Sequence, residues 1–389
     1  MNRALLLFYF CILLYTTKAI SQTYNPFYGD IVNTVSASNI VTDLTTFENF
    51  GIKTNGSTAI NNAKNWIVSR YQSLGYTDIV EQPFTYSGNT TNNIIVTKTG
   101  SVYPNTFIII DAHYDTLNGP GTNDNGSGTV LLLEMARLLH NINTEYSIKF
   151  IHFSGEEAGL IGSNYYVNNT AIPENLDISL VFNIDQVGGV NGALNDTLIC
   201  EYDASNPTEN NAESLTKTNS LANCISLYSN LSTELSYAYG SDYVPFENAG
   251  KVITGLYEKN ETPYSHTAND VLANMDPNYV FEVTKGSLGA ALEFAVGIST
   301  LSTQEVLPSQ KKNIKIYPNP SKGLVTVSSN FKSMTYYTVF ISDILGKKVY
   351  EKALNKQTQT LDLSRLKKGV YILTFKNKTE VVSKKLILN

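Results

Sequence analysis

Long apolar runs alternate with helix-patterned segments along most of the chain. Four runs are apolar at nearly every position, which predicts strands buried on both faces: TFIIIDAHYD, IKFIHFS, ISLVFNID and KVITGLYE. NIIVTKTG predicts a further strand that ends at Gly100, and helical spacing predicts helices over residues 59–74, GTVLLLEMARLLH and FEVTKGSLGAALEFAVG. The alternation predicts an α/β fold, a three-layer sandwich with a mixed, largely parallel central sheet.

The periodicity changes near residue 313. From there IKIYPNP, GLVTVSS and GVYILTFKN alternate apolar and polar positions between Pro, Gly and Asn turns, which predicts a small all-β sandwich over residues 313–389. The polar segment 299–312, with Pro308, is predicted to be a linker. Charge supports this boundary, because residues 1–310 carry 12 Lys and Arg against 30 Asp and Glu, whereas residues 311–389 carry 16 against 4.

The N-terminal segment has the pattern of an export signal. Arg3 precedes a short apolar stretch, and Ala19 and Ser21 have the spacing of a cleavage site, so residues 1–21 are predicted to be a signal peptide. Residues 22–298 then form the main domain. No later apolar stretch is long enough to cross a bilayer.

Two cysteines remain after the predicted cleavage, Cys200 and Cys224. In an oxidising compartment a disulfide between them would stabilise the fold by roughly 3 kcal/mol. Their spacing fits neither a CxxC motif nor a metal site, and it leaves both the paired and the free state open.

Histidines and carboxylates follow the ends of the predicted strands, which meet at one edge of an α/β sheet. The set comprises His113, Asp115, Asp124, Glu156, Glu157, Asp185 and His266. Separately, these residues could be a surface pair, a helix cap or a solvated loop, and His140 and His152 are predicted to be structural. Together they would repel each other unless cations lie among them, and imidazole with carboxylate predicts a two-zinc site.

Five motifs in order resemble the secreted co-catalytic di-zinc aminopeptidases of the bacterial leucyl aminopeptidase and aminopeptidase Y type. They are AHYDT, GTNDNGSG, FSGEEAGLIGS, NIDQVG and YSHTAND, and the resemblance covers about residues 40–300. It implies two Zn²⁺ ions in the catalytic domain. His113 and Asp185 would bind one ion, Glu157 and His266 the other, and Asp124 would bridge them.

The resemblance also implies a mechanism. A zinc-bridged hydroxide would hydrolyse the bond after the N-terminal residue of a peptide with a free N-terminus, and Glu156 would be the catalytic general base. Asp115 would accept a hydrogen bond from His113 and so fix its tautomer.

One position departs from the family pattern. Some members have Tyr directly before the histidine of the last motif, where it stabilises the oxyanion, but this chain has Ser265. Tyr243 and Tyr264 are candidates for that donor, or for aromatic pocket walls. Aromatic residues near the predicted site would suit a large apolar side chain of the substrate: Tyr239, Tyr243, Phe246 and Tyr257.

Three other functions fit parts of the pattern. A glutaminyl cyclase-like aminoacyltransferase would use a single zinc ion and usually lacks the NDNGSG form kept here. A carboxypeptidase of the glutamate carboxypeptidase kind would need basic residues near its pocket, and the first part of the chain has few. A binding module without metal would not need all five ligand positions and Glu156.

The basic C-terminal segment resembles the sorting domain of the type IX secretion system of Bacteroidetes. IYPNPSKGLVTV, DILGKKV, LDLSRLKKGVYIL and KKLILN carry the resemblance. It implies export across the inner and outer membranes, with the outer-membrane secretion machinery as partner and the cell surface or the medium as destination. Lysines that alternate with apolar residues indicate solvated strand faces and not a nucleic-acid surface.

Overall fold

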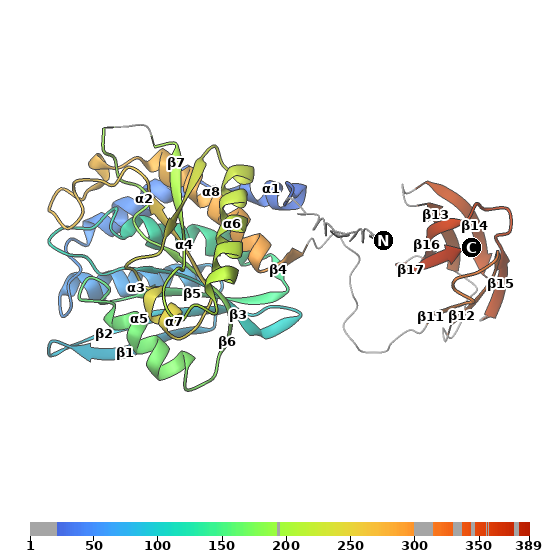
Figure 1. Ribbon diagram of the computed structural model, residues 1–389, viewed down its shortest axis with the longest axis horizontal. Helices are drawn as coiled ribbons and strands as arrows, with labels where there is room; N and C mark the ends of the chain where they lie inside the picture. Colours follow the sequence, from blue (N-terminus) through green and yellow to red (C-terminus); the bar gives the residue numbers. More distant parts are fainter. Residues whose placement is uncertain are drawn as a thin grey trace, which may run out of the picture. The chain divides into compact units, whose positions relative to one another are not determined.

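The computed structural model describes residues 22–192, 195–298, 314–329, 337–343, 347–354, 356, 358–376 and 381–389 (Figure 1). The predicted signal peptide and the predicted linker lie outside these residues. The chain divides into two compact units, residues 1–299 and 300–389. Within the described part of the chain, no helix has the length and apolar character needed to cross a membrane.

The larger unit is built on an eight-stranded sheet in the order β1-β2-β5-β3-β6-β9-β7-β8. Its strands are β1 (Ile79–Tyr86), β2 (Asn89–Lys98), β3 (Tyr103–His113), β5 (Tyr146–Phe153), β6 (Asp177–Ile184), β7 (Thr197–Tyr202), β8 (Ser232–Tyr237) and β9 (Ile253–Glu258). The four central strands β5, β3, β6 and β9 are parallel, whereas β2 pairs with β5 and β7 with β9 in antiparallel fashion. The predicted mixed, largely parallel sheet is confirmed.

The central strands are buried on both faces of the sheet. Successive side chains of a strand point to opposite sides, so each of these strands contributes to an apolar cluster on either side. On β3, Ile108 and Ile110 belong to one apolar cluster, while Ile109 belongs to the other. The first cluster packs against α1 (Pro26–Val32), α2 (Ala37–Asn49), α3 (Thr58–Ser73), α4 (Gly126–Leu139), α6 (Asn211–Tyr228) and α8 (Pro277–Phe294). The second packs against α5 (Ile161–Tyr166), η1 (Val167–Ala171) and α7 (Val244–Asn248), which completes three layers (Figure 1).

Three short elements complete this unit. β4 (Asn143–Thr144) pairs with β10 (Gly297–Ile298), and η2 (Leu272–Asn274) is a single 3₁₀ turn.

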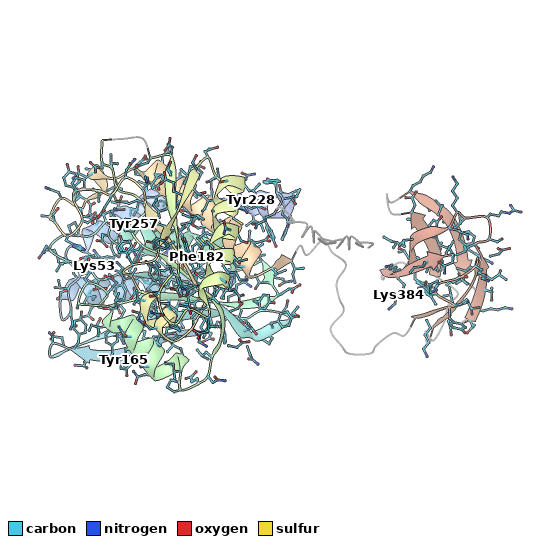
Figure 2. All side chains as sticks on the ribbon, in the orientation of Figure 1. Lys53, Tyr165, Phe182, Tyr228, Tyr257 and Lys384 are labelled. Atoms are coloured by element: carbon cyan, nitrogen blue, oxygen red, sulfur yellow. The ribbon has the colours of Figure 1, made fainter. Side chains whose placement is uncertain are left out.

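The smaller unit contains two antiparallel sheets over one apolar core, as predicted. One has the order β11-β12-β15 and the other β14-β13-β16-β17. Their strands are β11 (Ile314–Tyr317), β12 (Leu324–Ser329), β13 (Tyr337–Asp343), β14 (Lys348–Leu354), β15 (Thr358–Asp362), β16 (Gly369–Lys376) and β17 (Val381–Leu388). Val325, Val339 and Phe375 lie in the core, while Lys384, labelled in Figure 2, is exposed.

The histidines and cysteines away from the predicted site occupy structural positions. His152 lies on β5 without exposure to solvent and shares a hydrogen bond of 2.9 Å with the Tyr71 hydroxyl. His140 follows α4 directly. Cys200 on β7 and Cys224 on α6 are both buried and free, so the structure has the unpaired state.

Candidate metal centre

The predicted site residues gather at one edge of the sheet, where the parallel strands end. His113 is the last residue of β3, Asp185 follows β6 directly, and Glu156 and Glu157 follow β5. The remaining residues come from loops: Asp124 lies just before α4, and His266 lies in the loop after β9. This is the edge at which ligands bind in open α/β sheets.

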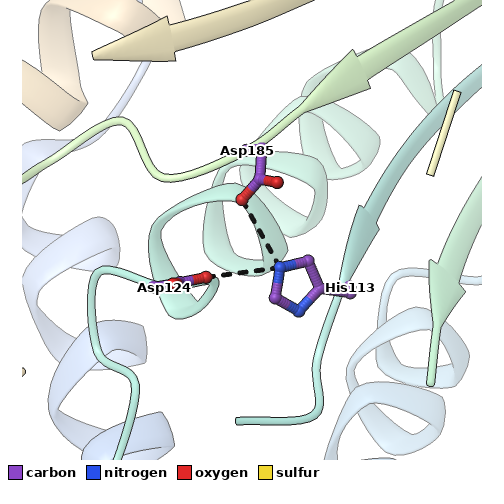
Figure 3. Close-up of side chains that lie close together, drawn as sticks. All are labelled: His113, Asp124 and Asp185. Carbon is purple, nitrogen blue, oxygen red and sulfur yellow. Dashed lines mark ion pairs between the residues drawn. The ribbon is translucent and has the colours of Figure 1, made fainter. Parts of the chain in front are cut away.

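His113, Asp124 and Asp185 form a first group (Figure 3). The Nε2 atom of His113 lies 3.3 Å from Asp124 Oδ1 and 3.4 Å from Asp185 Oδ1. Figure 3 shows both carboxylates directed at the same imidazole nitrogen. The His113 side chain is only 1% exposed.

A second group contains Asp124, Glu157 and His266. Here the Nε2 atom of His266 lies 3.1 Å from Asp124 Oδ2 and 3.0 Å from Glu157 Oε2. The two oxygens of Asp124 therefore face different histidines, one in each group. A carboxylate in that position can serve two ions at once.

The pKa values of the side chains in these two groups are shifted strongly from their ordinary values. Burial opposes ionisation of Asp124, but hydrogen bonds from His113 and His266 outweigh it and hold the pKa of Asp124 below its usual range. The hydrogen bond to Asp124 raises the pKa of His266 to about 9. Burial, with the charge of Asp124, raises the pKa of Glu157 to about 8.

The donor set fits zinc. Imidazole nitrogen and carboxylate oxygen are zinc ligands, and each group brings one histidine and two carboxylates together. Glu157 Oε1 is buried and has no hydrogen-bond partner, so one ligand oxygen lacks the compensation that a buried polar atom normally has. A cation bound between the carboxylates would supply it.

Glu156 has a different position from the ligand candidates. Its Oε2 atom lies 3.9 Å from His113 Nε2, outside both groups, and its side chain lines the cavity over the site. Burial, together with the neighbouring carboxylates, raises the pKa of Glu156 to about 10. Two bound cations would reverse this effect, because nearby positive charge favours the ionised carboxylate.

The Asp115 side chain is hydrogen-bonded to the backbone of the loop that follows β5. The His113 Nδ1 atom has the backbone carbonyl of Asp115 as its partner at 3.2 Å, and the Asp115 carboxylate lies 3.8 Å away. The expected hydrogen bond from His113 is thus made to the carbonyl of Asp115 and not to its side chain. The carboxylate instead accepts the backbone N–H groups of Glu156 at 3.2 Å and Glu157 at 3.3 Å.

Two more buried carboxylates hold ligand loops in the same way, and sequence reasoning missed both. Asp270 accepts the backbone N–H groups of Asn123 at 2.8 Å and Asp124 at 3.0 Å. Glu258 accepts those of Gly188 at 3.1 Å and Gly189 at 2.6 Å, in the loop after Asp185. A signal was present, since Asp270 lies within YSHTAND and Glu258 ends a strand at the same sheet edge.

The sequence analysis also did not predict a structural role for Lys53, which is labelled in Figure 2. Its ammonium group has no exposure to solvent and donates to the carbonyls of Phe47 at 3.2 Å, Gly51 at 2.8 Å and Pro120 at 2.6 Å. It thereby fastens α2 to the loop that leads to Asp124. A single lysine in GIKTNGS gives no sequence signal for this role.

The start of α4 is fixed against the end of β6. Asn125 caps the helix by accepting the backbone N–H of Gly128 at 2.9 Å, and its amide donates to the Ile184 carbonyl at 2.8 Å. A Cβ atom on Gly128 would lie 2.6 Å from that same carbonyl oxygen, so a larger residue would push the helix away. The Asn and Gly of NDNGSG therefore place Asp124 beside Asp185.

A hydrogen bond joins the loops that carry Asp185 and His266. The Ser265 hydroxyl donates to Gln186 Oε1 at 2.5 Å, and Gln186 Nε2 donates to the Tyr257 hydroxyl. Gln186 and His266 both have positive φ, 25° and 57°. Non-glycine residues in this region cost energy and gather at functional sites. The Ser265–Gln186 contact thus connects one candidate ligand of each group.

The predicted aromatic residues divide between the cavity and the core. Tyr239 and Tyr257 line the cavity, whereas Phe246 and Tyr243 are buried. The Tyr243 hydroxyl donates to Glu201 Oε2 at 3.1 Å, and Tyr243 is not part of the cavity lining. Tyr264 is half-buried and is not part of the cavity lining.

Two family models match the chain. Residues 93–290 match Peptidase family M28, and residues 315–389 match the Secretion system C-terminal sorting domain. The second match indicates export to the cell surface or the medium. Aminopeptidase YwaD of Bacillus subtilis (strain 168) is 32% identical over 198 residues, which are 49% of this chain and 42% of the relative. The chain therefore spans less than half the length of that relative.

Solved structures share the fold. LapB from Legionella pneumophila superimposes with a TM-score of 0.62 at 23% identity, over 70% of this chain and 78% of that chain. A glutaminyl cyclase from Bacteroides thetaiotaomicron superimposes with a TM-score of 0.55 at 18% identity, over 66% of this chain and 97% of that chain. At these identities both matches establish the three-layer fold alone.

Proposed function

Because this chain belongs to peptidase family M28, we propose that it is an exported zinc-dependent aminopeptidase, which removes N-terminal residues from peptides. The observation that carries the proposal is the position of Asp124, whose two oxygens face His113 and His266 at 3.3 and 3.1 Å. That arrangement suits two ions that share one carboxylate. His113 and Asp185 would hold one ion, and Glu157 and His266 the other.

Zinc, when bound, would supply a more acidic water molecule and would polarise the scissile carbonyl. The chain supplies the proton transfer. The Glu156 carboxylate, which lines the cavity, takes a proton from the attacking water and delivers it to the leaving amine. Asp115 keeps Glu156 and Glu157 in place through their backbone N–H groups, so that one carboxylate can bind metal while its neighbour remains free to act as base.

The two units have separate tasks in this proposal. Residues 22–298 form the catalytic domain, residues 299–312 the linker, and residues 313–389 the sorting domain. The sorting domain is recognised by the outer-membrane secretion machinery and takes no part in catalysis.

The test is the zinc content of the purified protein after dialysis against a few micromolar zinc. Two ions per chain, with hydrolysis of leucine p-nitroanilide and no hydrolysis of its N-acetylated form, are expected. One ion per chain with cyclisation of N-terminal glutamine would replace the proposal with a glutaminyl cyclase-like reaction. No bound zinc would indicate a binding module.

The Asp124→Ala variant makes the test specific. It removes the proposed shared carboxylate and should reduce the zinc content, because each group then keeps only one histidine and one carboxylate. Asp196→Ala is the matched control, since Asp196 lies outside both groups, directly before β7. An unchanged zinc content in Asp124→Ala would contradict the bridging role.

A further inference from the structure

The cavity over the site is acidic and polar. It has a volume of about 570 Å³, and its lining contains no Lys or Arg. Most of its carboxylates belong to the proposed metal ligands or to Glu156. One does not, the side chain of Glu261 in the loop after β9.

Glu261 presents a free carboxylate at the cavity wall. Its side chain is exposed, and its backbone carbonyl accepts a hydrogen bond of 3.0 Å from Asn191, which ties the loop down. The nearby Lys259 forms its ion pair with Glu234 at 2.5 Å. Among the residues that the structure describes, no Lys or Arg pairs with Glu261.

Two tyrosines stand beside this carboxylate and form an aromatic corner. The rings of Tyr239 and Tyr257 have centroids 6.1 Å apart and an interplanar angle of 75°. Burial is the largest cause that raises the pKa of each tyrosine, and the negative charge of Glu261 is a smaller cause for both. The hydroxyl of Tyr257, labelled in Figure 2, accepts a hydrogen bond from the side-chain amide of Gln186.

An aromatic corner with a free carboxylate has the chemistry of a cation site. Ammonium and guanidinium groups bind over aromatic faces, and they pair with carboxylates. The lining residue Leu160 offers an apolar contact for an aliphatic stem. A long side chain with a terminal positive charge can therefore pack its stem on Leu160 and place its charge beside the tyrosines and Glu261.

We propose that Glu261, Tyr239 and Tyr257 form a subsite for a cationic side chain, so that the enzyme prefers peptides whose N-terminal residue is arginine or lysine. This inference rests on the proposed function and names its substrate class. It replaces the sequence-based expectation of a pocket for large apolar side chains, because only two of the four aromatic residues line the cavity and the carboxylate of Glu261 lines it together with them.

The test compares arginine with citrulline as the N-terminal residue of an aminocoumarin amide, because citrulline has nearly the same shape without the charge. An exposed ion pair and a cation–π contact each contribute a few-fold, so the ratio of kcat/KM for arginine over citrulline should be about 10. Glu261→Gln should bring that ratio close to one. Tyr239→Leu should lower it a few-fold, and Tyr239→Phe should restore it, since the aromatic face is kept.

Glu209→Gln is the matched control. It removes the same charge from an exposed position outside the cavity, and should leave the ratio unchanged. This separates a local subsite from the general attraction of an acidic surface for a cation.

Three results would overturn the inference. A ratio near one in the unaltered protein would mean that the charge is not recognised. If Glu261→Gln lowered arginine and citrulline hydrolysis equally, the carboxylate would instead bind the α-ammonium group that all substrates share. If the unaltered protein hydrolysed none of the leucine, arginine and citrulline amides, the proposed function would be wrong, and the proposed subsite with it.

Discussion

His152 should make the larger unit sensitive to mild acid. Its ring has no exposure to solvent, lies at 68° to the Tyr71 ring with centroids 5.6 Å apart, and shares a hydrogen bond with the Tyr71 hydroxyl. Burial lowers the pKa of His152 from 6.5 to about 3. The folded protein therefore keeps this histidine neutral at a pH where the unfolded chain takes up a proton.

The size of the effect follows from these two pKa values. Because the folded pKa is the lower one, the stability that His152 contributes is fully present above pH 6.5 and is lost as the pH falls towards 3. Between pH about 7.5 and pH about 5, proton uptake by the unfolded chain lowers the free energy of unfolding by about 2 kcal/mol.

The measurement is urea unfolding at both pH values, followed by the fluorescence of Trp66, the only tryptophan of the chain, which lies on the same helix as Tyr71. His152→Gln keeps a hydrogen-bonding group near the Nε2 position but cannot titrate. It should be less stable than the unaltered protein at the higher pH, and the difference should shrink by about 2 kcal/mol at the lower pH.

Other acidic groups contribute equally to both proteins and cancel in this difference. A gap between the unaltered protein and His152→Gln that stays constant from pH about 7.5 to about 5 would refute the reasoning.

Three further predictions concern the site and the division of the chain. Glu156→Gln should keep both zinc ions but lose about 10²–10⁴ in kcat, and substantial remaining turnover would remove Glu156 as the base. Ser265→Ala should weaken zinc binding about 10-fold in a chelator competition, because it breaks the contact to Gln186, whereas Ser232→Ala on the exposed β8 should not, and equal affinities would reject the coupling. A chain that ends at about residue 305 should hydrolyse leucine p-nitroanilide as well as the full chain does, and a folded but inactive truncated chain would give the smaller unit a role in catalysis.

The central strands could be predicted because they are buried on both faces. β3, β5, β6 and β9 are runs of apolar residues, and such runs have few other places in a soluble fold. The edge strand β8 and helix α6 were not predicted. β8 is short and mostly exposed, and α6 is polar along most of its length, so neither has a clear apolar period.

The candidate site was predictable to a similar degree and for a related reason. The parallel central strands all end at the same edge of the sheet, so the first polar residues after each strand lie at that edge. The positions of His113, Glu157 and Asp185 therefore follow from sequence order alone. The contacts that Asp270 and Gln186 make could not be found in this way. Their partners, Asp124 and Ser265, lie 146 and 79 residues away in the chain, and only the folded structure brings them together.

The free cysteines determine how this protein would fail after export. The sorting domain sends the chain to a place where thiols are readily oxidised, yet burial raises the pKa of the Cys224 thiol to about 12 and that of Cys200 well above its ordinary value. The reactive thiolate is therefore absent from the folded state. Each unfolding event uncovers both sulfur atoms, and an oxidised chain can no longer regain the buried, free arrangement. Because thiols oxidise over seconds to hours, more slowly than most domains refold, the rate of this loss follows the fraction of chains that is unfolded at equilibrium.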